Sequence, residues 1–150
     1  MNPQLKEFLQ PYDKDIQDLA LELRLFITTI APEANELIWD NYNALAIAYS
    51  KSEKLKDAFC HLSIYSKHVN FGFNRGSELI ESKLKLKGTG KLIRHIQVNG
   101  MDTFPIEEVK KSVMEAIAIS DELNPGLTKK NTLGISKVMS ISKKKIRPKR

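Results

Sequence analysis

The stretch that decides the fold is residues 59–73, Phe-Cys-His-Leu-Ser-Ile-Tyr-Ser-Lys-His-Val-Asn-Phe-Gly-Phe. Apolar and polar side chains alternate in its first seven and in its last five residues. Such alternation is typical of a strand with one buried face. The four residues 65–68, Tyr-Ser-Lys-His, allow only a tight connection between the two parts. The pattern therefore predicts a pair of antiparallel strands over residues 59–65 and 69–73.

Two further short segments on either side of this pair have the same character. Residues 43–49 and 93–98 alternate and contain β-branched or aromatic side chains, as strands do. Residues 50–57 are polar and rich in lysine, which suits a long hairpin loop. Strands that follow one another in this way form an antiparallel sheet.

Two amphipathic segments enclose the strands. In residues 13–30 apolar side chains recur at helical spacing, and Pro32 closes the segment. Residues 105–123 show the same period, with Pro105 in its first turn and Asn-Pro-Gly after it. We expect two long helices there, and shorter helical turns over residues 4–10 and 33–38.

The order of helix, strands and helix predicts an α+β fold. Two helices can cover the apolar side of an antiparallel sheet of about five strands, which gives a two-layer sandwich. Residues 1–126 are expected to form one domain. Residues 127–150 are rich in glycine, serine and lysine without a sustained apolar period, and are predicted to be a basic, mostly disordered tail.

The net charge of +6 is distributed unevenly along the chain. Residues 129–150 contain nine of the 24 basic residues and no acidic one, so the rest of the chain carries a net charge of −3. A single cysteine excludes an internal disulfide framework and fits a reducing compartment. With no membrane-spanning apolar run and no secretory signal, a cytoplasmic protein without a membrane partner is expected.

Residues 88–95, Gly-Thr-Gly-Lys-Leu-Ile-Arg-His, hold the densest set of candidate ligand-binding groups. Backbone amides freed by glycine, together with fixed cations, are what phosphate or carboxylate recognition requires. A P-loop is excluded because the glycines are too close and a strand, not a helix, follows. The competing interpretation is a solvated glycine turn. For a small anionic or phosphorylated ligand, the expected contacts are Lys67, His68, Arg75, Gly88, Thr89, Gly90, Lys91, Arg94 and His95.

Several short motifs occur in a recognisable order and spacing. They are Trp39-Asp40, Lys67-His68-Val69, Gly72-Phe73-Asn74-Arg75-Gly76, Glu78-Leu79, Gly88-Thr89-Gly90-Lys91 and Arg94-His95. Over residues 13–121 the chain thereby resembles the YdhG-like family of small bacterial proteins, a domain of unknown function. The resemblance implies a frataxin-like fold. Because some members are described as frataxin-like iron chaperones, it also implies iron handling, with iron–sulfur or haem assembly proteins as partners.

Iron would be held, on this resemblance, by carboxylates of the first long helix. Asp15, Asp18 and Glu22 fall on one face of that helix, where their side chains are neighbours. The residues themselves have a simpler explanation, because acids near a helix start stabilise the helix dipole and exposed helix faces are normally charged. The iron role therefore rests on the resemblance.

The three histidines and the cysteine lie on or beside the predicted strands. His61, His68 and His95 could converge on a metal near Cys60, but hydrogen-bonded structural roles explain each histidine better. Cys60 and His61 are neighbours on one strand and point to opposite faces, which argues against a nucleophile–base pair. Cys60 is expected to be a small buried hydrophobe.

No recognisable catalytic motif is present in the sequence, so a binding protein is expected rather than an enzyme. A frataxin-like iron chaperone is the first interpretation, by resemblance. Binding of a small anion or phosphorylated ligand through residues 88–95 is the second. Nucleic-acid binding through the basic tail is the third. An exposed sheet face would also allow the protein to dimerise.

Overall fold

The computed structural model describes residues 1–127 and 132–146. This part of the chain contains three α-helices and six β-strands. The helices are α1 (Pro3–Leu9), α2 (Lys14–Ile30) and α3 (Ile106–Leu123). The strands are β1 (Asn35–Asp40), β2 (Leu45–Ser50), β3 (Ala58–Ile64), β4 (Val69–Phe73), β5 (Arg94–Val98) and β6 (Ser136–Ile141).

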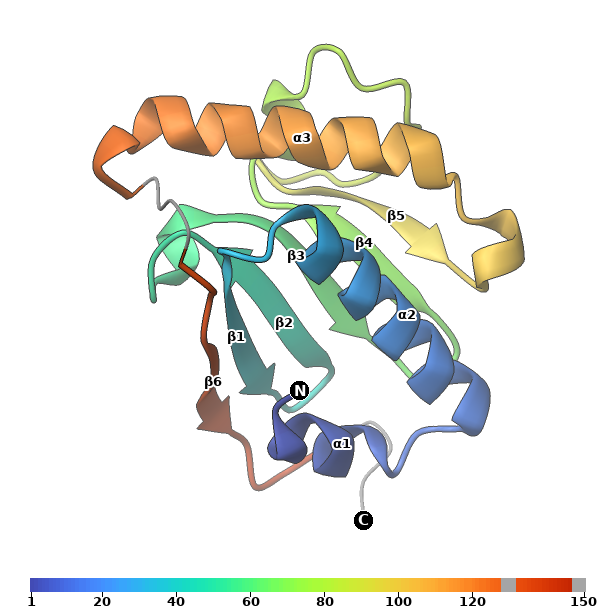
Figure 1. The fold of residues 1–150 in the computed structure, drawn as a ribbon. Helices are drawn as coiled ribbons and strands as arrows, with labels where there is room; N and C mark the ends of the chain where they lie inside the picture. Colours follow the sequence, from blue (N-terminus) through green and yellow to red (C-terminus); the bar gives the residue numbers. More distant parts are fainter. Residues whose placement is uncertain (128–131, 147–150) are drawn as a thin grey trace.

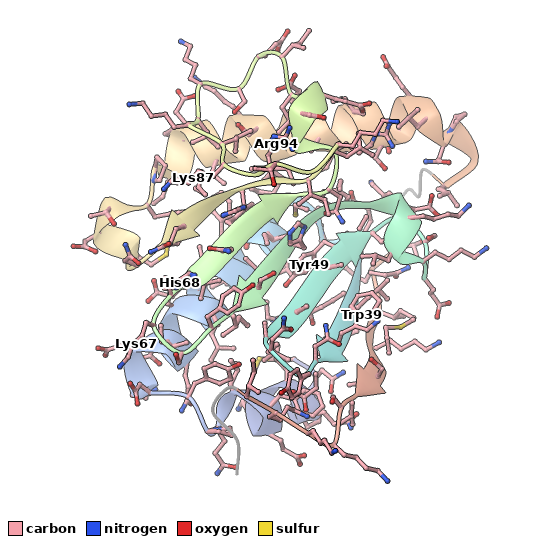
Figure 2. All side chains as sticks on the ribbon, turned by 180° about the vertical axis from the view of Figure 1, so that it is seen from behind. Trp39, Tyr49, Lys67, His68, Lys87 and Arg94 are labelled. Carbon is pink, nitrogen blue, oxygen red and sulfur yellow. The ribbon has the colours of Figure 1, made fainter. Side chains whose placement is uncertain are left out.

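The strands form one sheet in the order β5-β4-β3-β2-β1-β6. Consecutive strands from β1 to β5 pair antiparallel, whereas β6 lies parallel to β1, so the sheet is mixed. Helices α2 and α3 cover one face (Figure 1). The view from behind shows the opposite face in front of the helices (Figure 2). The predicted α+β class and the two layers are confirmed.

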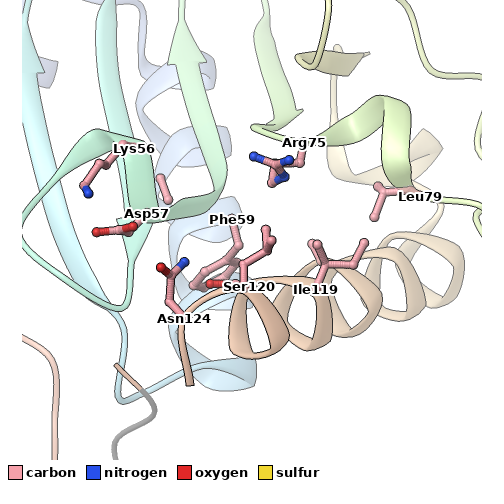
Figure 3. A pocket seen from close by; sticks show the side chains of 11 residues that line it. Lys56, Asp57, Phe59, Arg75, Leu79, Ile119, Ser120 and Asn124 are labelled. Carbon is pink, nitrogen blue, oxygen red and sulfur yellow. The ribbon is translucent and has the colours of Figure 1, made fainter. Parts of the chain in front are cut away.

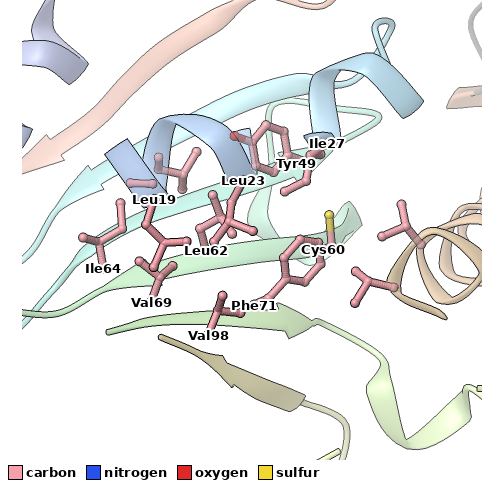
Figure 4. Close-up of a cluster of buried hydrophobic side chains, with 14 of the residues drawn as sticks. Leu19, Leu23, Ile27, Tyr49, Cys60, Leu62, Ile64, Val69, Phe71 and Val98 are labelled. Atoms are coloured by element: carbon pink, nitrogen blue, oxygen red, sulfur yellow. The ribbon is translucent and has the colours of Figure 1, made fainter. Parts of the chain in front are cut away.

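The core lies between the sheet and the two long helices. Leu23 and Ile27 of α2 pack with Leu62 and Phe71 of the central strands, and all four are fully buried (Figure 4). Burying an apolar side chain of this size contributes about 1.5–3 kcal/mol, so this layer supplies most of the stability. Cys60 lies in the same layer, where burial raises the pKa of its thiol, and its prediction as a buried hydrophobe is confirmed. Among the described residues, no helix has both the length and the apolar character needed to cross a membrane.

One predicted element is wrong. The helical turn expected over residues 33–38 is instead the strand β1, which pairs with β2 on one side and β6 on the other. Leu37 and Ile38 are neighbours in sequence and both are fully buried. A strand covered on both faces shows a continuous apolar run rather than alternation, which hides it from a search for period two.

The tail contains the second correction. Residues 136–141 were predicted to be disordered, but they form β6 along the edge of β1. Gly134 permits this approach: its amide donates to the Pro32 carbonyl at 2.9 Å, and a Cβ on it would come 1.8 Å from the Ala34 carbonyl oxygen. Because backbone pairing holds the strand while its side chains stay mostly exposed, the composition resembles that of a disordered segment. The predicted disorder also covers residues 128–131 and 147–150, which lie outside the described residues.

A buried carboxylate ties the tail to the domain. Glu36 accepts hydrogen bonds from Arg24 at 2.7 and 3.2 Å, from the Tyr49 hydroxyl at 2.8 Å and from the Ser136 hydroxyl at 2.7 Å. Burial and the neighbouring Glu36 raise the pKa of Tyr49 well above its usual value, so Tyr49 remains a donor. These contacts join α2, β1, β2 and β6 at one point.

Candidate ligand-binding groove

The helix-free face of the sheet carries small and polar side chains where the other face carries the core. Strand pairing places Ala48, His61, Gly72 and His95 in one row across β2, β3, β4 and β5. Side chains alternate between faces along a strand, so this row lies opposite the buried Leu62 and Phe71. The low bulk of alanine and glycine leaves this face hollow near its centre.

A groove of about 700 Å³ opens on this face. Ala46 and Ala48 of β2 line its middle, and Trp39 of β1 and His61 of β3 line it from the strands on either side. Residues 90–93, from the loop before β5, form a further part of the wall. The groove therefore offers a flat floor of small side chains between an indole and an imidazole.

The charged groups of the groove are all basic. Lys56, Arg75 and Lys91 line it, and its lining residues, all of which the structure describes, include no aspartate or glutamate. Arg75 forms a bidentate contact with the Glu78 carboxylate: Nε donates to Oε1 at 2.6 Å and Nη2 donates to Oε2 at 2.8 Å. This contact raises the pKa of Arg75 and lowers that of Glu78. Within residues 1–127 and 132–146, neither lysine takes part in a salt bridge.

The imidazole of His61 lies directly over Gly72. A Cβ on Gly72 would come 2.1 Å from Nε2, so only glycine leaves room for the ring. Nδ1 lies 2.9 Å from the Asn74 side-chain oxygen. Burial lowers the pKa of His61, which keeps the ring neutral. With Nδ1 donating to Asn74, Nε2 is the ring's acceptor.

The glycine loop is closed by its own residues. Arg94 donates from Nη1 to the carbonyl oxygens of Gly90 and Ile93, at 2.6 and 2.7 Å. Ser77 supports the loop from the other side, through its amide to the Leu92 carbonyl at 2.9 Å. Gly88 has a φ of 139°, which glycine tolerates and other residues rarely adopt. Through these contacts Arg94 stabilises the loop that precedes it.

The structure brings together only some of the nine residues predicted for the anion site. Arg75, Gly90 and Lys91 line the groove, while Gly88 and Thr89 of the loop and Arg94, the first residue of β5, do not line it. The segment after β4 lies close to the start of β5, since a Cβ on Gly76 would come 2.5 Å from the Arg94 Cβ.

The other part of that prediction, convergence with Lys67 and His68, is wrong. Both residues lie in the turn before β4 (Figure 2), whereas Arg75 follows the opposite end of that strand. His68 stacks on Tyr65, with ring centroids 5.0 Å apart. His95 lies close enough to Lys87 and His68 for their charges to affect it. Partial burial lowers the pKa of His95, and these two neighbours lower it further. A strand of five residues separates the two ends, so one small ligand cannot contact both.

The sequence did not indicate most of the groove residues as anion contacts, among them Trp39, Lys56, His61 and Asn74. Trp39 and Asn74 were part of family motifs, and His61 was considered only as a metal ligand. Lys56 lay in the polar, lysine-rich segment 50–57, which was predicted only as a hairpin loop. A usable signal existed in the alternation of β2, where alanines at positions 46 and 48 share one face.

The carboxylates predicted to bind iron do not assemble into a ligand set. Asp15, Asp18 and Glu22 are exposed on α2, and Asp18 pairs with Lys14 at 2.6 Å. Across the described residues, no three histidine, cysteine, aspartate or glutamate side chains are grouped so that they could hold a metal ion. The alternative in which the histidines converge on a metal fails for the same reason.

A smaller hollow of about 50 Å³ adjoins the groove at Lys56 and Arg75 (Figure 3). It is bounded by the C-terminal part of α3, including Ser120, and by Asn124, which follows the helix. Lys56 and Arg75 line both this hollow and the groove, so they stand where the two meet. The groove thus has a cationic end, at Lys56 and Arg75, distinct from its indole end at Trp39.

Comparison with known proteins found no matching family model, no similar curated protein and no similar solved structure. The groove is therefore interpreted from its own geometry and chemistry.

Proposed function

We propose that the protein binds a small anionic ligand that carries a flat ring, in the groove on the helix-free face of the sheet. The observation that carries this proposal is the combination of three basic side chains with an indole and a neutral imidazole, without a carboxylate in the lining. Fixed cations suit phosphate and carboxylate groups. Aromatic side chains suit the faces of flat rings.

The arrangement supports one orientation of such a ligand. A ring over Ala46 and Ala48 lies between Trp39 and His61, and the neutral imidazole offers Nε2 to a ring N–H. The anionic group then reaches the end of the groove where Arg75 stands. A volume of about 700 Å³ is ample for a molecule of nucleotide size, since small-molecule sites span about 300–1,000 Å³.

Trp39 is the only tryptophan of the chain, so its fluorescence reports on the groove. The experiment titrates the protein with nucleoside monophosphates, aromatic carboxylates and inorganic phosphate. We expect a saturable change with at least one ligand that has both a ring and an anionic group, and a smaller response to inorganic phosphate.

Matched variants locate the binding. Lys56→Gln and Lys91→Gln each remove one cation from the groove and should weaken binding by about tenfold, which corresponds to about 1.4 kcal/mol. Lys67→Gln removes an exposed cation from the far end of β4 and should leave the affinity unchanged. The proposal fails if no ligand produces a saturable change in the wild type, or if Lys67→Gln weakens binding as much as the groove variants do.

For the fold, the order of helix, antiparallel strands and closing helix supports a frataxin-like arrangement and the YdhG-like resemblance, which we retain as a proposal. We do not extend it to iron transfer, because the predicted carboxylates form no ligand set in the described residues.

A further inference from the structure

A second groove, of about 720 Å³, lies on the outer side of α3, next to residues 78–82. Its exposed apolar side chains are unusually prominent: Ile80 is 89% exposed and Met114 is 54% exposed. Neither belongs to the core or to the ligand groove. A pair of exposed apolar side chains in one hollow suggests a surface that another segment covers.

The walls of this α3 groove are predominantly acidic. Its lining residues include five glutamates against two lysines. Glu78 is engaged by Arg75. Glu115 accepts from the Glu81 amide at 3.1 Å through one oxygen, while its other oxygen is buried without a hydrogen-bond partner among the described residues. The groove therefore favours a basic segment that also carries an apolar side chain.

The chain itself contains a segment of this chemistry. Residues 143–146 are Lys-Lys-Lys-Ile, and three more basic residues follow by position 150. Lys143 and Lys144 are exposed, and the Ile146 side chain is 68% exposed. Lys145 is less free, because it pairs with Asp40 at 3.4 Å.

The segment and the α3 groove lie at opposite ends of the molecule. The Ile146 amide donates to the Tyr42 carbonyl, just beyond β1 and near α1 (Figure 1). Helix α3 crosses the other end of the sheet, where β3 begins and β4 ends. The described segment therefore cannot reach the α3 groove of its own chain.

We propose that residues 143–146 of one copy dock in the α3 groove of a second copy. Ile146 packs against Ile80 and Met114, while Lys143 and Lys144 approach the glutamates of the wall. Charge complementarity and the matching apolar side chains support this choice of occupant. Because two different surfaces meet, a pair with one such contact keeps the free groove of one copy and the free segment of the other, so head-to-tail association continues beyond a pair.

Sedimentation velocity of the full chain tests this proposal. At low salt the average mass should rise steadily with concentration, beyond that of a dimer. In about 1 M salt, where the Debye length is only about 3 Å, association should disappear. Replacing the exposed isoleucine, Ile80→Ser, should weaken association by about tenfold or more without touching the core.

Charge reversal on both sides gives the decisive comparison. The groove pair Glu107→Lys with Glu122→Lys, and the segment pair Lys143→Glu with Lys144→Glu, should each abolish association. Combining all four substitutions restores opposite charges and should restore association. Lys67→Glu, an exposed reversal elsewhere, is the matched control and should associate like the wild type.

Three results would overturn the proposal. The wild type could remain monomeric at every concentration in low salt. Association could persist in the reversal variants and in Ile80→Ser, which would place the contact elsewhere, such as on the open sheet face. The four-fold variant, folded by circular dichroism, could stay monomeric, which would show that the two surfaces do not meet.

Discussion

Replacing Gly72 with alanine tests whether the position of His61 shapes the ligand groove. A Cβ at this position would come 2.1 Å from Nε2 and 2.3 Å from Cε1 of His61. Gly72 does not have a positive φ, so alanine is compatible with the backbone of β4. The imidazole must therefore swing away from the strand and lose its contact with Asn74.

The substitution should change the free energy of unfolding little, but it should change the pKa of His61. Losing the hydrogen bond between His61 and Asn74 costs about 1 kcal/mol. Alanine in a strand recovers roughly 0.5–1 kcal/mol relative to glycine. The free energy of unfolding should thus change by less than about 1 kcal/mol. The pKa of His61, lowered mainly by burial, should rise toward its ordinary value of 6.5.

The pH dependence of stability provides a second measurement with a defined sign. In the wild type the folded-state pKa of His61 lies below its unfolded value, so the unfolded chain binds more protons. Stability is then complete above pH 6.5, the ordinary value, and declines as the pH falls below it. The Gly72→Ala variant should lose part of this decline.

Proton NMR titration of the histidine rings measures the pKa, and denaturant unfolding on both sides of the ordinary value measures stability. Gly90→Ala is the control, because a Cβ there would meet nothing within 4 Å. If His61 keeps its lowered pKa in Gly72→Ala, the ring does not lie where the structure places it. If the free energy of unfolding falls by several kcal/mol, the backbone of β4 has shifted instead of the His61 ring.

Three further predictions concern the tail, the buried carboxylate and iron. Gly134→Ala should detach β6, because its Cβ would meet the Ala34 carbonyl oxygen at 1.8 Å; hydrogen exchange should show faster exchange along β1 and unchanged exchange in α2. Tyr49→Phe removes a donor from Glu36 and should cost about 1.5–3 kcal/mol of unfolding free energy, so an equally stable variant would contradict the described contact. Ferrous iron titrated anaerobically should show no saturable binding; saturable binding that Asp18→Asn abolishes would restore the iron interpretation.

The regular, amphipathic elements could be predicted closely. The helix expected over residues 13–30 is α2, Lys14–Ile30, because its apolar side chains repeat at the helical period. The strand expected over residues 69–73 is β4 with the same limits, because it alternates. The strand β1 escaped prediction since both of its faces are covered, and β6 since backbone pairing rather than side-chain burial holds it.

Of the residues predicted for the anion site, the groove brings together two from one loop, and Arg75 from the segment after β4. Gly90 and Lys91 line the groove together, as their place in a single loop suggested. Lys67 was also expected among the contacts, although the length of β4 keeps it away. Asn74 and His61 meet because β3 and β4 pair side by side, and register is a property of two strands rather than of either.

By itself, the sequence determined the α+β class, the two long helices, four strands and the separation of charge between body and tail. These follow from local periodicity and composition, which each segment expresses alone. Only the tertiary structure decided which strands lie at the edges and that the tail completes the sheet. It also decided that Arg94 holds the loop before β5, and that Lys56 and Trp39 line one groove. Such contacts connect residues far apart in the chain, and they depend on pairing, register and close packing that no single segment encodes.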